Sequence, residues 1–350
     1  MPRGVAEWFG MKKIGVLFGW ENSFPSALVE RINARNPAGI KAEFLQTGAV
    51  LANQAPRYAV IIDRISHDIP FYRAFLKHAA LNGTTVINDP SLCSSDDKFL
   101  NYALAARLGV AVPPTVLLPQ KEYAPGTTEK SLRNLEFPLD WDAIFAAVGE
   151  HGFLKPVHGA GGRDVYEVRS RNEFFRAYDQ SRRLCMVYQK AVAFSDYYRC
   201  FVVGRKNVRI MAYDPRKPFA ERYLKRAARA TSFKARKLFA RMEEDALKLC
   251  RALGYDLNTV EFAVEKGVPY AIDFMNPVPD ADINSVGPHH FEWIVKQTAD
   301  LAIARARSAP RRRRHPALAA AAPPKRAQPK KKIVPRRDEH GVLDLWLEPV

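Results

Sequence analysis

Over the first ninety residues, short apolar runs alternate with amphipathic stretches. The runs at 12–20, 58–62 and 84–87 are short, continuous and rich in aliphatic residues, which predicts buried strands. The stretches that begin at Pro25 and span 69–81 have helical spacing, and proline suits a first helical turn. This alternation predicts a small parallel sheet covered by helices, with a ligand site at the carboxyl edge of the sheet.

Beyond residue 93 the pattern changes to many short strands and a few longer helices. Gln120 to Leu139 is polar and contains proline, and is expected to be a surface insertion. Helices are expected over 94–108, 140–150, 232–253 and 291–304. Strands are expected at 115–119, 153–156, 165–168, 186–190, 198–203, 207–213, 260–264 and 269–274. The expected class is α/β, mixed with α+β.

Composition is that of a soluble enzyme, with 47% hydrophobic and 11% aromatic residues. No apolar stretch is long enough to cross a bilayer, so no membrane contact is expected. The first residues lack the apolar core of a secretory signal. Cys93, Cys185, Cys200 and Cys250 are far apart without a CxxC pair, which favours free thiols, no zinc site and a cytoplasmic location.

The net charge of +17 is unevenly distributed. Between Ser308 and Arg337 the sequence has eleven lysines and arginines and no acid, so the body is only mildly basic. This Ala/Pro-rich tail is expected to be disordered, either as a solvated linker or as a segment that contacts polyanions. The final stretch, Gly341 to Val350, is apolar enough to dock onto another surface.

The most informative chemistry lies between Phe153 and Val168. A strand delivers Lys155, a loop with Gly159, Gly161 and Gly162 follows, and a second strand begins. Glycines allow positive φ and bring N–H groups close to an oxyanion, and the lysine adds a compact positive charge. The segment lacks the Walker A and Rossmann patterns. Taken alone, a glycine-rich hairpin with an exposed lysine explains it equally well.

Four further segments follow a particular order: 88–98, 187–192, 198–204, and 259–264 with 270–277. In this order the chain resembles the ATP-grasp superfamily, in particular RimK-type glutamate ligases and glutathione synthetases. The resemblance covers about residues 12–304. It implies an ATP-grasp fold, in which two lobes clamp the nucleotide behind an N-terminal parallel α/β domain. The expected regions are an extension (1–11), the N-terminal domain (12–92), the central lobe (93–190), the C-terminal lobe (191–307) and the tail (308–350).

The resemblance also implies residue roles. Lys98 and Lys155 correspond to the nucleotide-contacting lysines, and the loop with Gly159, Gly161 and Gly162 covers the phosphates. Arg199 is expected to face the phosphates or the substrate, although a surface charge is an alternative. The adenine hinge corresponds to Gln189, Lys190, Ala191 and Val192. The magnesium (or manganese) ligands correspond to Glu261, Asp273 and Asn276, oxygen donors that suit the ion.

Three departures from the family pattern matter. Lys190 stands where the family usually has an acid. The ribose-binding acid aligns with Tyr197, so Asp196, one place away, is assigned instead. Two residues separate Asp273 from Asn276, which places them on opposite faces of a regular strand. A β-bulge could restore a shared face, or else Asp280 or Asp282 supplies the oxygen.

The implied activity is an ATP-dependent, ADP-forming ligation of a carboxylate to an amine through an acyl-phosphate. Small molecules or peptides are the expected substrates, and the basic stretch from Arg216 to Arg229 favours an acidic one. Two alternatives remain open. One is an ATP-grasp kinase that phosphorylates a small molecule, and the other is a degenerate ATP-binding protein that acts through its basic tail. Glu261 and Asp273 also have a plain alternative, as a solvated strand residue and a strand end.

Overall fold

The structure is a computed structural model. It describes residues 11–35, 37–54, 56–93, 97–159, 162–218, 221–223, 232–309, 331–337, 341 and 343–349. Residues 1–309 form one compact unit and 310–350 a second. Each unit is described by itself.

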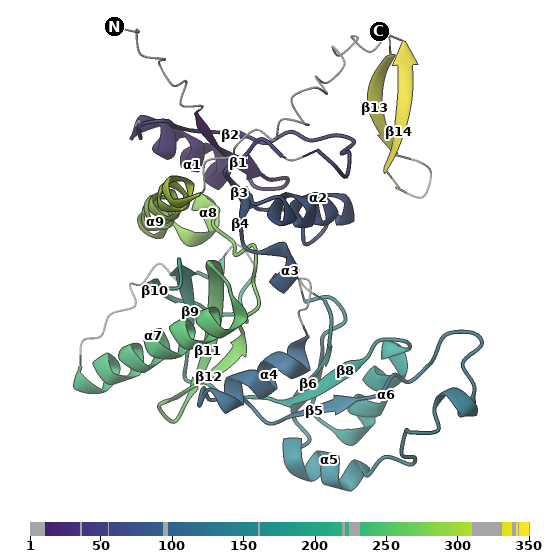
Figure 1. The fold of residues 1–350 in the computed structure, drawn as a ribbon. Coiled ribbons are helices and arrows are strands. Elements are labelled where there is room, and N and C mark those ends of the chain that lie inside the picture. Colours follow the sequence, from purple (N-terminus) through teal and green to yellow (C-terminus); the bar gives the residue numbers. More distant parts are fainter. Residues whose placement is uncertain are drawn as a thin grey trace, which may run out of the picture. The chain divides into compact units, whose positions relative to one another are not determined.

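The N-terminal part of the first unit is a four-stranded parallel sheet, as the pattern predicts (Figure 1). Its strand order is β2-β1-β3-β4. The strands are β1 (Lys12–Leu17), β2 (Ile40–Phe44), β3 (Val60–Asp63) and β4 (Thr85–Ile87). Strand β2 was not expected, because its charged residues Lys41 and Glu43 interrupt the apolar run of an edge strand.

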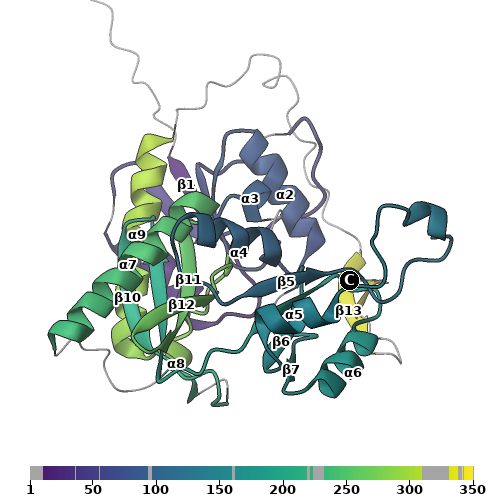
Figure 2. The ribbon, with the colours of Figure 1, turned by 90° about the horizontal axis from the view of Figure 1, so that it is seen from below.

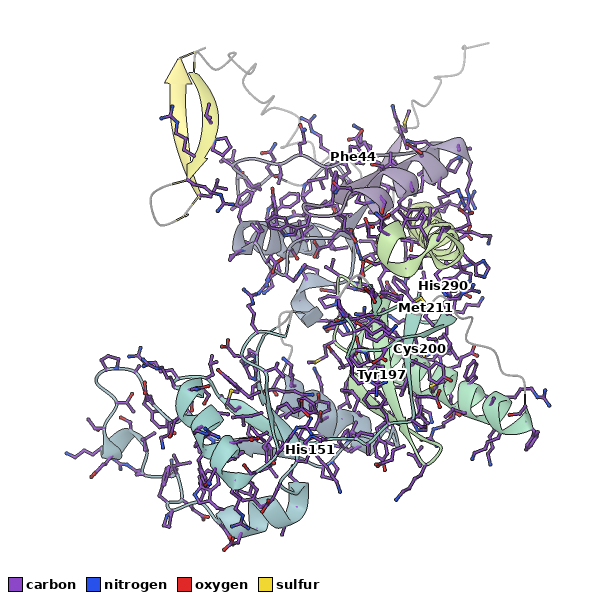
Figure 3. The ribbon with its side chains drawn as sticks, turned by 180° about the vertical axis from the view of Figure 1, so that it is seen from behind. Phe44, His151, Tyr197, Cys200, Met211 and His290 are labelled. Atoms are coloured by element: carbon purple, nitrogen blue, oxygen red, sulfur yellow. The ribbon has the colours of Figure 1, made fainter. Side chains whose placement is uncertain are left out.

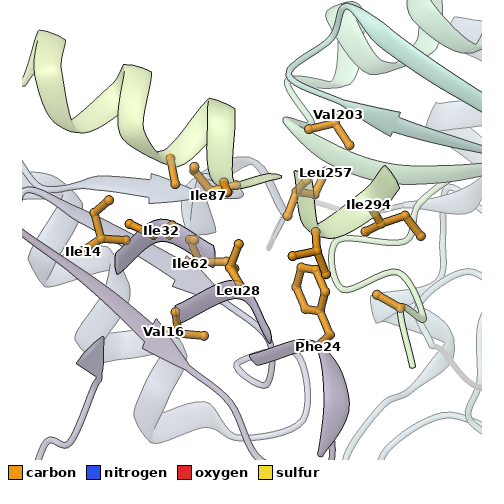
Figure 4. Packing of buried hydrophobic residues seen from close by; sticks show 14 of the residues in the cluster. Ile14, Val16, Phe24, Leu28, Ile32, Ile62, Ile87, Val203, Leu257 and Ile294 are labelled. Atoms are coloured by element: carbon orange, nitrogen blue, oxygen red, sulfur yellow. The ribbon is translucent and has the colours of Figure 1, made fainter. Parts of the chain in front are cut away.

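Helices cover both faces of this sheet. Helix α2 (Pro70–Leu81) packs with one group of buried residues that includes Ile61 and Phe75. On the other face, α1 (Ser23–Ala34) packs against α9 (Pro288–Ser308), which returns from the far end of the unit. The apolar residues between them continue into the C-terminal lobe, where Val203 and Leu257 belong to the same core (Figure 4).

The central lobe contains an antiparallel sheet with its own core. Its order is β5-β8-β6-β7, from β5 (Thr115–Leu118), β8 (Met186–Lys190), β6 (Gly152–Pro156) and β7 (Tyr166–Val168). The short helix η1 (Glu129–Ser131) lies in the polar insertion. Helices α5 (Trp141–Val148) and α6 (Arg171–Ser181) pack on the sheet through residues such as Phe145 and Phe174. Helix α6 was not expected, because most of its residues are polar.

The C-terminal lobe contains a second antiparallel sheet, of order β10-β9-β11-β12. Its strands are β9 (Asp196–Val203), β10 (Asn207–Ala212), β11 (Leu257–Glu265) and β12 (Val268–Asp273). The amphipathic helix α7 (Phe233–Leu253) buries Met242, Ala246 and Leu249 against it. Helix α4 (Lys98–Arg107) contributes Tyr102 and Ala105 to this same core. Figure 2 shows the two antiparallel sheets beside each other, with α7 on one and α5 and α6 on the other.

Two short helices complete the first unit. Helix α3 (Pro90–Cys93) follows β4, and α8 (Ile283–Val286) precedes α9. The described cysteines Cys185, Cys200 and Cys250 are free thiols. Among the helices that the structure describes, none combines the length and apolarity needed to span a membrane.

Part of the second unit is an antiparallel hairpin of β13 (Lys331–Arg337) and β14 (Leu343–Pro349). The prediction of a disordered tail is therefore wrong for these two segments. In β14, every second residue is a leucine (Leu343, Leu345 and Leu347), and the residues between and after them include Asp344 and Glu348. This period of two is typical of a strand and was overlooked beside the basic composition. Residues 310–330, which contain most of the basic run, lie outside the described part of the chain.

Candidate nucleotide and metal site

Lys155 comes from β6, the strand before the glycine loop. Its Nζ donates to Gln189 Oε1 at 2.9 Å. Burial lowers the pKa of Lys155 to about 8; Asp273 and Glu261 raise it, and nearby Lys98 lowers it further. The sequence alternative of an exposed hairpin lysine is therefore wrong, because the ammonium is inside a site with other charges.

Lys98 is the first residue of α4 and reaches the same glycine loop. Asp97 caps the helix by accepting from Leu100 N. Lys98 N donates to Val157 O at 3.1 Å, and Lys98 Nζ donates to Gly159 O at 2.7 Å. The helix was expected to begin at Ser94, but Asp97 is the residue that caps it.

The glycine loop needs glycine at two of its described positions. Gly159 has φ of 148° and Gly162 has φ of 72°, both of which strain residues that have a Cβ. Gly161, the third predicted member, lies outside the described residues, as does Ala160. The loop backbone therefore has the conformations that permit N–H groups to approach an anion.

The two predicted metal-binding acids face each other across neighbouring strands. Glu261 on β11 is opposite Asp273 on β12, and the next pair is Phe262 with Ala271. Ile272 is thus an extra residue and forms a β-bulge, but this bulge lies before Asp273 and not between Asp273 and Asn276, where a shared face would have needed one; β12 ends at Asp273 and Asn276 follows in the next loop. Tyr102 donates its hydroxyl to Ile272 O at 2.7 Å, which supports the bulge from α4.

Asn276 is held beside these acids by its own hydrogen bonds. Its N–H donates to Asn258 Oδ1 at 2.9 Å, and its Nδ2 donates to Thr259 O at 3.2 Å. With the nitrogen used in this way, the side-chain oxygen remains as the group that can bind a cation. Of the two alternatives, Asp280 lines the larger cavity described below. Asp282 instead caps α8 and accepts from Ser23 Oγ at 2.7 Å, away from the acids.

Glu261 is fixed by two neighbours on β9. Tyr197 donates its hydroxyl to Glu261 Oε2 at 2.7 Å, and Arg199 Nε lies 3.3 Å from Glu261 Oε1. Figure 3 labels Tyr197 on the sheet of the C-terminal lobe. Burial raises the pKa of Glu261; Arg199 lowers it, and Asp273 raises it again. Tyr197, which aligns with the family's ribose-binding acid, thus donates a hydrogen bond to Glu261, a predicted metal ligand.

Arg199 is 8% exposed and surrounded by aromatic rings. Its guanidinium lies 5.2 Å from the centre of the Tyr213 ring, and its Nη1 donates to the hydroxyl of Tyr223 at 2.7 Å. Burial lowers the pKa of Arg199, but Tyr223 and Glu261 raise it above its ordinary value. The surface-charge alternative is therefore wrong for this residue.

The predicted hinge consists of the last two residues of β8 and the two that follow it, and lines neither of the two cavities described next. Lys190 N donates to Pro114 O at 2.9 Å and Ala191 N donates to His151 O at 3.1 Å, while Val192 O accepts from Phe194 N at 3.0 Å. Asp196, the predicted ribose acid, begins β9 and accepts from Ser195 Oγ at 3.3 Å. Its role stays a prediction.

Two cavities bring most of the predicted residues together. The smaller, of about 220 Å³, is lined by Lys98, Lys155, Gly159, Gly162, Glu261, Asp273 and Asn276, and also by Tyr102, Arg163 and Met275. The larger, of about 880 Å³, shares several of these and adds Arg199. Its other walls include Arg222, Tyr213 and the segment that follows β3, with Asp63, Ser66, His67, Asp68 and Arg73.

Some of these lining residues were missed by the sequence analysis. Tyr102 lies four residues after Lys98, a spacing that places both on one face of a helix and could have revealed it. The segment after β3 lies at the carboxyl edge of the parallel sheet, where a ligand was expected. No spacing in the sequence indicates Arg163 or Tyr213.

The described donor set fits a magnesium-like cation. It offers two carboxylates and one amide oxygen, which are the ligand types that Mg²⁺ prefers. Burial is the main cause that raises the pKa of Glu261, and the neighbouring carboxylate of Asp273 raises it further. A bound divalent cation would relieve that repulsion. Within the described residues, no cluster of three or more His, Cys, Asp or Glu side chains suits a metal.

Comparison with solved structures identifies the fold. A RimK domain protein of the ATP-grasp type from Sphaerobacter thermophilus matches with a TM-score of 0.59 and 18% identity, over 82% of this chain and 98% of that one. D-alanine–D-alanine ligase from Bacillus anthracis, complexed with ATP, matches with a TM-score of 0.58 and 16% identity, over 84% and 96%.

The ATP-grasp ligase PsnB, complexed with a minimal precursor, Mg and ADP, matches with a TM-score of 0.55 and 14% identity, over 84% of this chain and 97% of that one. No protein-family model and no curated protein matches the sequence. This chain has a parallel N-terminal sheet followed by two antiparallel sheets, and each match extends over nearly all of the matched protein. The chain therefore adopts the ATP-grasp fold.

Proposed function

We propose that this protein is an ADP-forming ligase that activates a carboxylate as an acyl-phosphate and couples it to an amine. The observation that carries the proposal is the smaller cavity. There Lys98 of α4 and Lys155 of the central sheet line the same cavity as two acids of the C-terminal sheet, Glu261 and Asp273. Cations for phosphates on one side and oxygen ligands for their cation on the other are what a bound Mg·ATP requires.

The adenine would bind at the hinge. Lys190 N donates to Pro114 O, but Pro114 has no N–H with which to return a bond to the Lys190 carbonyl. Among the hydrogen bonds of the described residues, none uses the Val192 N–H. One acceptor and one donor two residues apart suit the edge of an adenine ring, and the side chain of Lys190 is not required.

The phosphates would lie in the smaller cavity, where Lys98 and Lys155 supply positive charge. Gly159 and Gly162 would let the loop backbone approach the phosphates closely. Glu261, Asp273 and Asn276 would hold Mg²⁺ or Mn²⁺, which neutralises charge on the transferred phosphoryl group. Arg199 and Tyr197 hold Glu261 in place from behind. These residues orient the reactants and stabilise charge, and no protein nucleophile is needed.

In the first step, a substrate carboxylate oxygen attacks the γ-phosphorus, the bond to the β-phosphate oxygen breaks, and ADP leaves. In the second step, the amine attacks the acyl carbon, phosphate leaves, and the amine loses a proton to solvent. The substrates would occupy the larger cavity, whose walls include Arg73, Arg199 and Arg222. These guanidinium groups, which share the cavity with Asp63, Asp68 and Asp280, would bind the carboxylate of the substrate. PsnB, whose structures include a precursor peptide, makes a peptide carboxylate a reasonable candidate beside a free amino acid.

The test is a screen of acidic amino acids and acidic peptides with Mg·ATP. A substrate should release ADP and phosphate, and hydroxylamine in place of the amine should trap the acyl-phosphate as a hydroxamate. Lys155→Ala should abolish both signals. Release of AMP would contradict the mechanism, and a stable phosphoester would show a kinase. The cytoplasm, which supplies ATP, is the proposed location.

The basic tail is proposed as a separate contact for polyanions, because its charge is concentrated in one segment. Removing residues after Ala309 should leave ATP turnover intact and weaken heparin binding. If the full chain shows no salt-dependent heparin binding, the tail is a solvated linker.

A further inference from the structure

Gln189 stands out because its backbone belongs to the strand that leads to the hinge, while its side chain contacts the phosphate side of the site. It is 1% exposed, on β8 between β5 and β6. Its Oε1 accepts from Lys155 Nζ at 2.9 Å, and its Nε2 donates to Thr115 Oγ1 at 2.9 Å. Neither contact is part of the hinge role that the family resemblance assigns to this residue.

The network fixes which way the amide points. Thr115 Oγ1 donates to Pro113 O at 2.9 Å, and a carbonyl can only accept. The hydroxyl hydrogen of Thr115 is therefore already used, so the hydroxyl can only accept from Gln189. The nitrogen of the amide must face Thr115, and its oxygen must face Lys155. A backbone carbonyl in the loop before β5 thus determines the acceptor that the lysine meets.

The acceptor, Gln189 Oε1, is neutral, which is important because Lys155 must keep its charge to bind phosphate. The charged groups that face Lys155 from other elements are Lys98 on α4, Glu261 on β11 and Asp273 on β12. A carboxylate at position 189 would pair with the ammonium directly and cancel its charge. An amide fixes the ammonium in position and leaves the whole charge available.

We propose that Gln189 is a positioning residue that holds Lys155 for the nucleotide phosphates through a neutral hydrogen bond, with Thr115 fixing the orientation of the amide. This inference rests on the proposed nucleotide site. It also joins two parts of that site, since the proposed adenine hinge, Lys190 to Val192, directly follows Gln189 in the chain. Tyr102 extends the network. Its hydroxyl is within hydrogen-bond contact of the Gln189 side-chain amide, and it donates to the carbonyl of Ile272 at the bulge.

The experiment measures two dissociation constants by calorimetry on the full-length protein, one for Mg·AMPPNP and one for adenosine, which has no phosphates. Gln189→Met removes the acceptor while it keeps the length of the side chain. We expect Mg·AMPPNP to bind roughly tenfold more weakly and adenosine to bind within about twofold of wild type, because a hydrogen bond to a charged group is lost only on the phosphate side.

Gln189→Glu separates charge from position. Its carboxylate can still hold Lys155, but it neutralises the ammonium and repels phosphate, so Mg·AMPPNP should again bind at least about tenfold more weakly. Wild-type affinity should decrease between pH 7.5 and 9 as Lys155 loses its proton, and the pair in Gln189→Glu should hold that proton and flatten the profile. A purely structural role would not change the pH profile.

Thr115→Val tests the far end of the network. It should weaken Mg·AMPPNP binding by roughly threefold, because the amide is no longer held in one orientation. Thr298→Val is the matched control, a buried threonine on α9 outside the site, and should leave both constants unchanged. The two threonine variants keep the inference testable if the Gln189 variants do not fold.

Two failures are distinguishable. If wild-type protein binds neither Mg·AMPPNP nor adenosine, the nucleotide site itself is wrong. If wild type binds Mg·AMPPNP and Lys155→Met weakens it, but Gln189→Met and Thr115→Val bind as wild type does, only the positioning role is overturned. Equal weakening of AMPPNP and adenosine in Gln189→Met would also overturn it, because the effect would then be on the hinge strand.

Discussion

The C-terminal and central lobes carry similar four-stranded antiparallel sheets but are built into the molecule differently. The C-terminal sheet shares a core with the N-terminal sheet, because Val203 and Leu257 pack in one cluster with Ile14 and Ile294 (Figure 4). The central sheet has a core of its own, around Phe174. Helix α4 belongs by chain order to the central region, yet it packs in the core of the C-terminal lobe.

Because the two lobes have separate cores, the candidate site is formed by residues from two separately packed parts of the chain. The proposed oxygen ligands Glu261, Asp273 and Asn276 lie on the lobe whose core is continuous with the N-terminal sheet. Lys155 and its acceptor Gln189 lie on the separately packed lobe. A ligand that binds both would hold the two bodies together, which suits a reaction that must exclude water from an acyl-phosphate.

The largest expected effect comes from opening one core at a time. Phe24→Ala and Phe174→Ala each remove a fully buried ring, at a cost of about 3–5 kcal/mol. Phe174→Ala should increase amide hydrogen exchange in β5 to β8 and spare β9 to β12. Phe24→Ala should increase exchange in the N-terminal sheet and in β9 and β11 together. If Phe24→Ala leaves β9 and β11 protected, the shared core does not couple these regions.

The second prediction concerns the acids on the C-terminal lobe, Glu261 and Asp273. Asp273→Asn should lower Mg·ATP turnover roughly 10²–10³-fold, equivalent to about 3–4 kcal/mol, because a cation ligand is lost. Asp282→Asn is the control, since this side chain caps α8 and an asparagine can still cap. Equal losses in the two variants would indicate that the whole loop matters rather than a metal ligand at position 273.

The third prediction concerns the cation of the separate lobe. Lys155→Met should weaken Mg·AMPPNP binding by about 1.5–3 kcal/mol, roughly 10–150-fold. Lys190→Met, on the hinge, should have no effect if adenine pairs only with backbone. Calorimetry measures both, and a comparable loss in Lys190→Met would show that the hinge side chain binds nucleotide.

The pH dependence follows from the same lysine. The pKa of Lys155 is about 8, and phosphate needs the charged form. The charged fraction then falls from about nine-tenths at pH 7 to about one-tenth at pH 9, so wild-type affinity should fall roughly tenfold over this range. Lys155→Met should show a flatter profile. A wild-type profile that is level to pH 9 would contradict the lowered pKa.

Much of the fold was predictable where the period of apolar residues is clean. The helix expected over 232–253 is α7 (Phe233–Leu253), and the strand expected over 186–190 is β8. Strand β2 and helix α6 were not predicted because polar residues dominate them, so only a narrow apolar stripe is buried. Strand β2 is stable as the edge of a sheet and helix α6 is capped by Ser170, and the spacing of apolar residues indicates neither effect.

The candidate site was predictable as a set of residue types and much less as a geometry. Family spacing locates Lys98, Lys155 and Glu261, which line one cavity. The bulge at Ile272 was not predicted, because the spacing suggested one between Asp273 and Asn276; the observed bulge depends on pairing with β11 and on Tyr102 from a distant helix. That Tyr197 would bind Glu261 rather than a ribose was also beyond sequence reasoning.

The smallest expected effect concerns the hydrogen bonds between β1 and the C-terminal end of α9. Lys12 Nζ, at the start of β1, donates to Ala306 O, Arg307 O and Ala309 O at 2.9, 3.1 and 2.7 Å. A cation at the last carbonyls of a helix stabilises it, so Lys12→Met should lower the free energy of unfolding by about 1 kcal/mol in urea titrations. The neighbouring Lys13 forms only a partly exposed pair with Glu43, and Lys13→Met should cost no more than about 0.5 kcal/mol. Equal losses would mean that position along β1, rather than the helix cap, determines the effect, and α9 would then be held to the shared core by apolar packing alone.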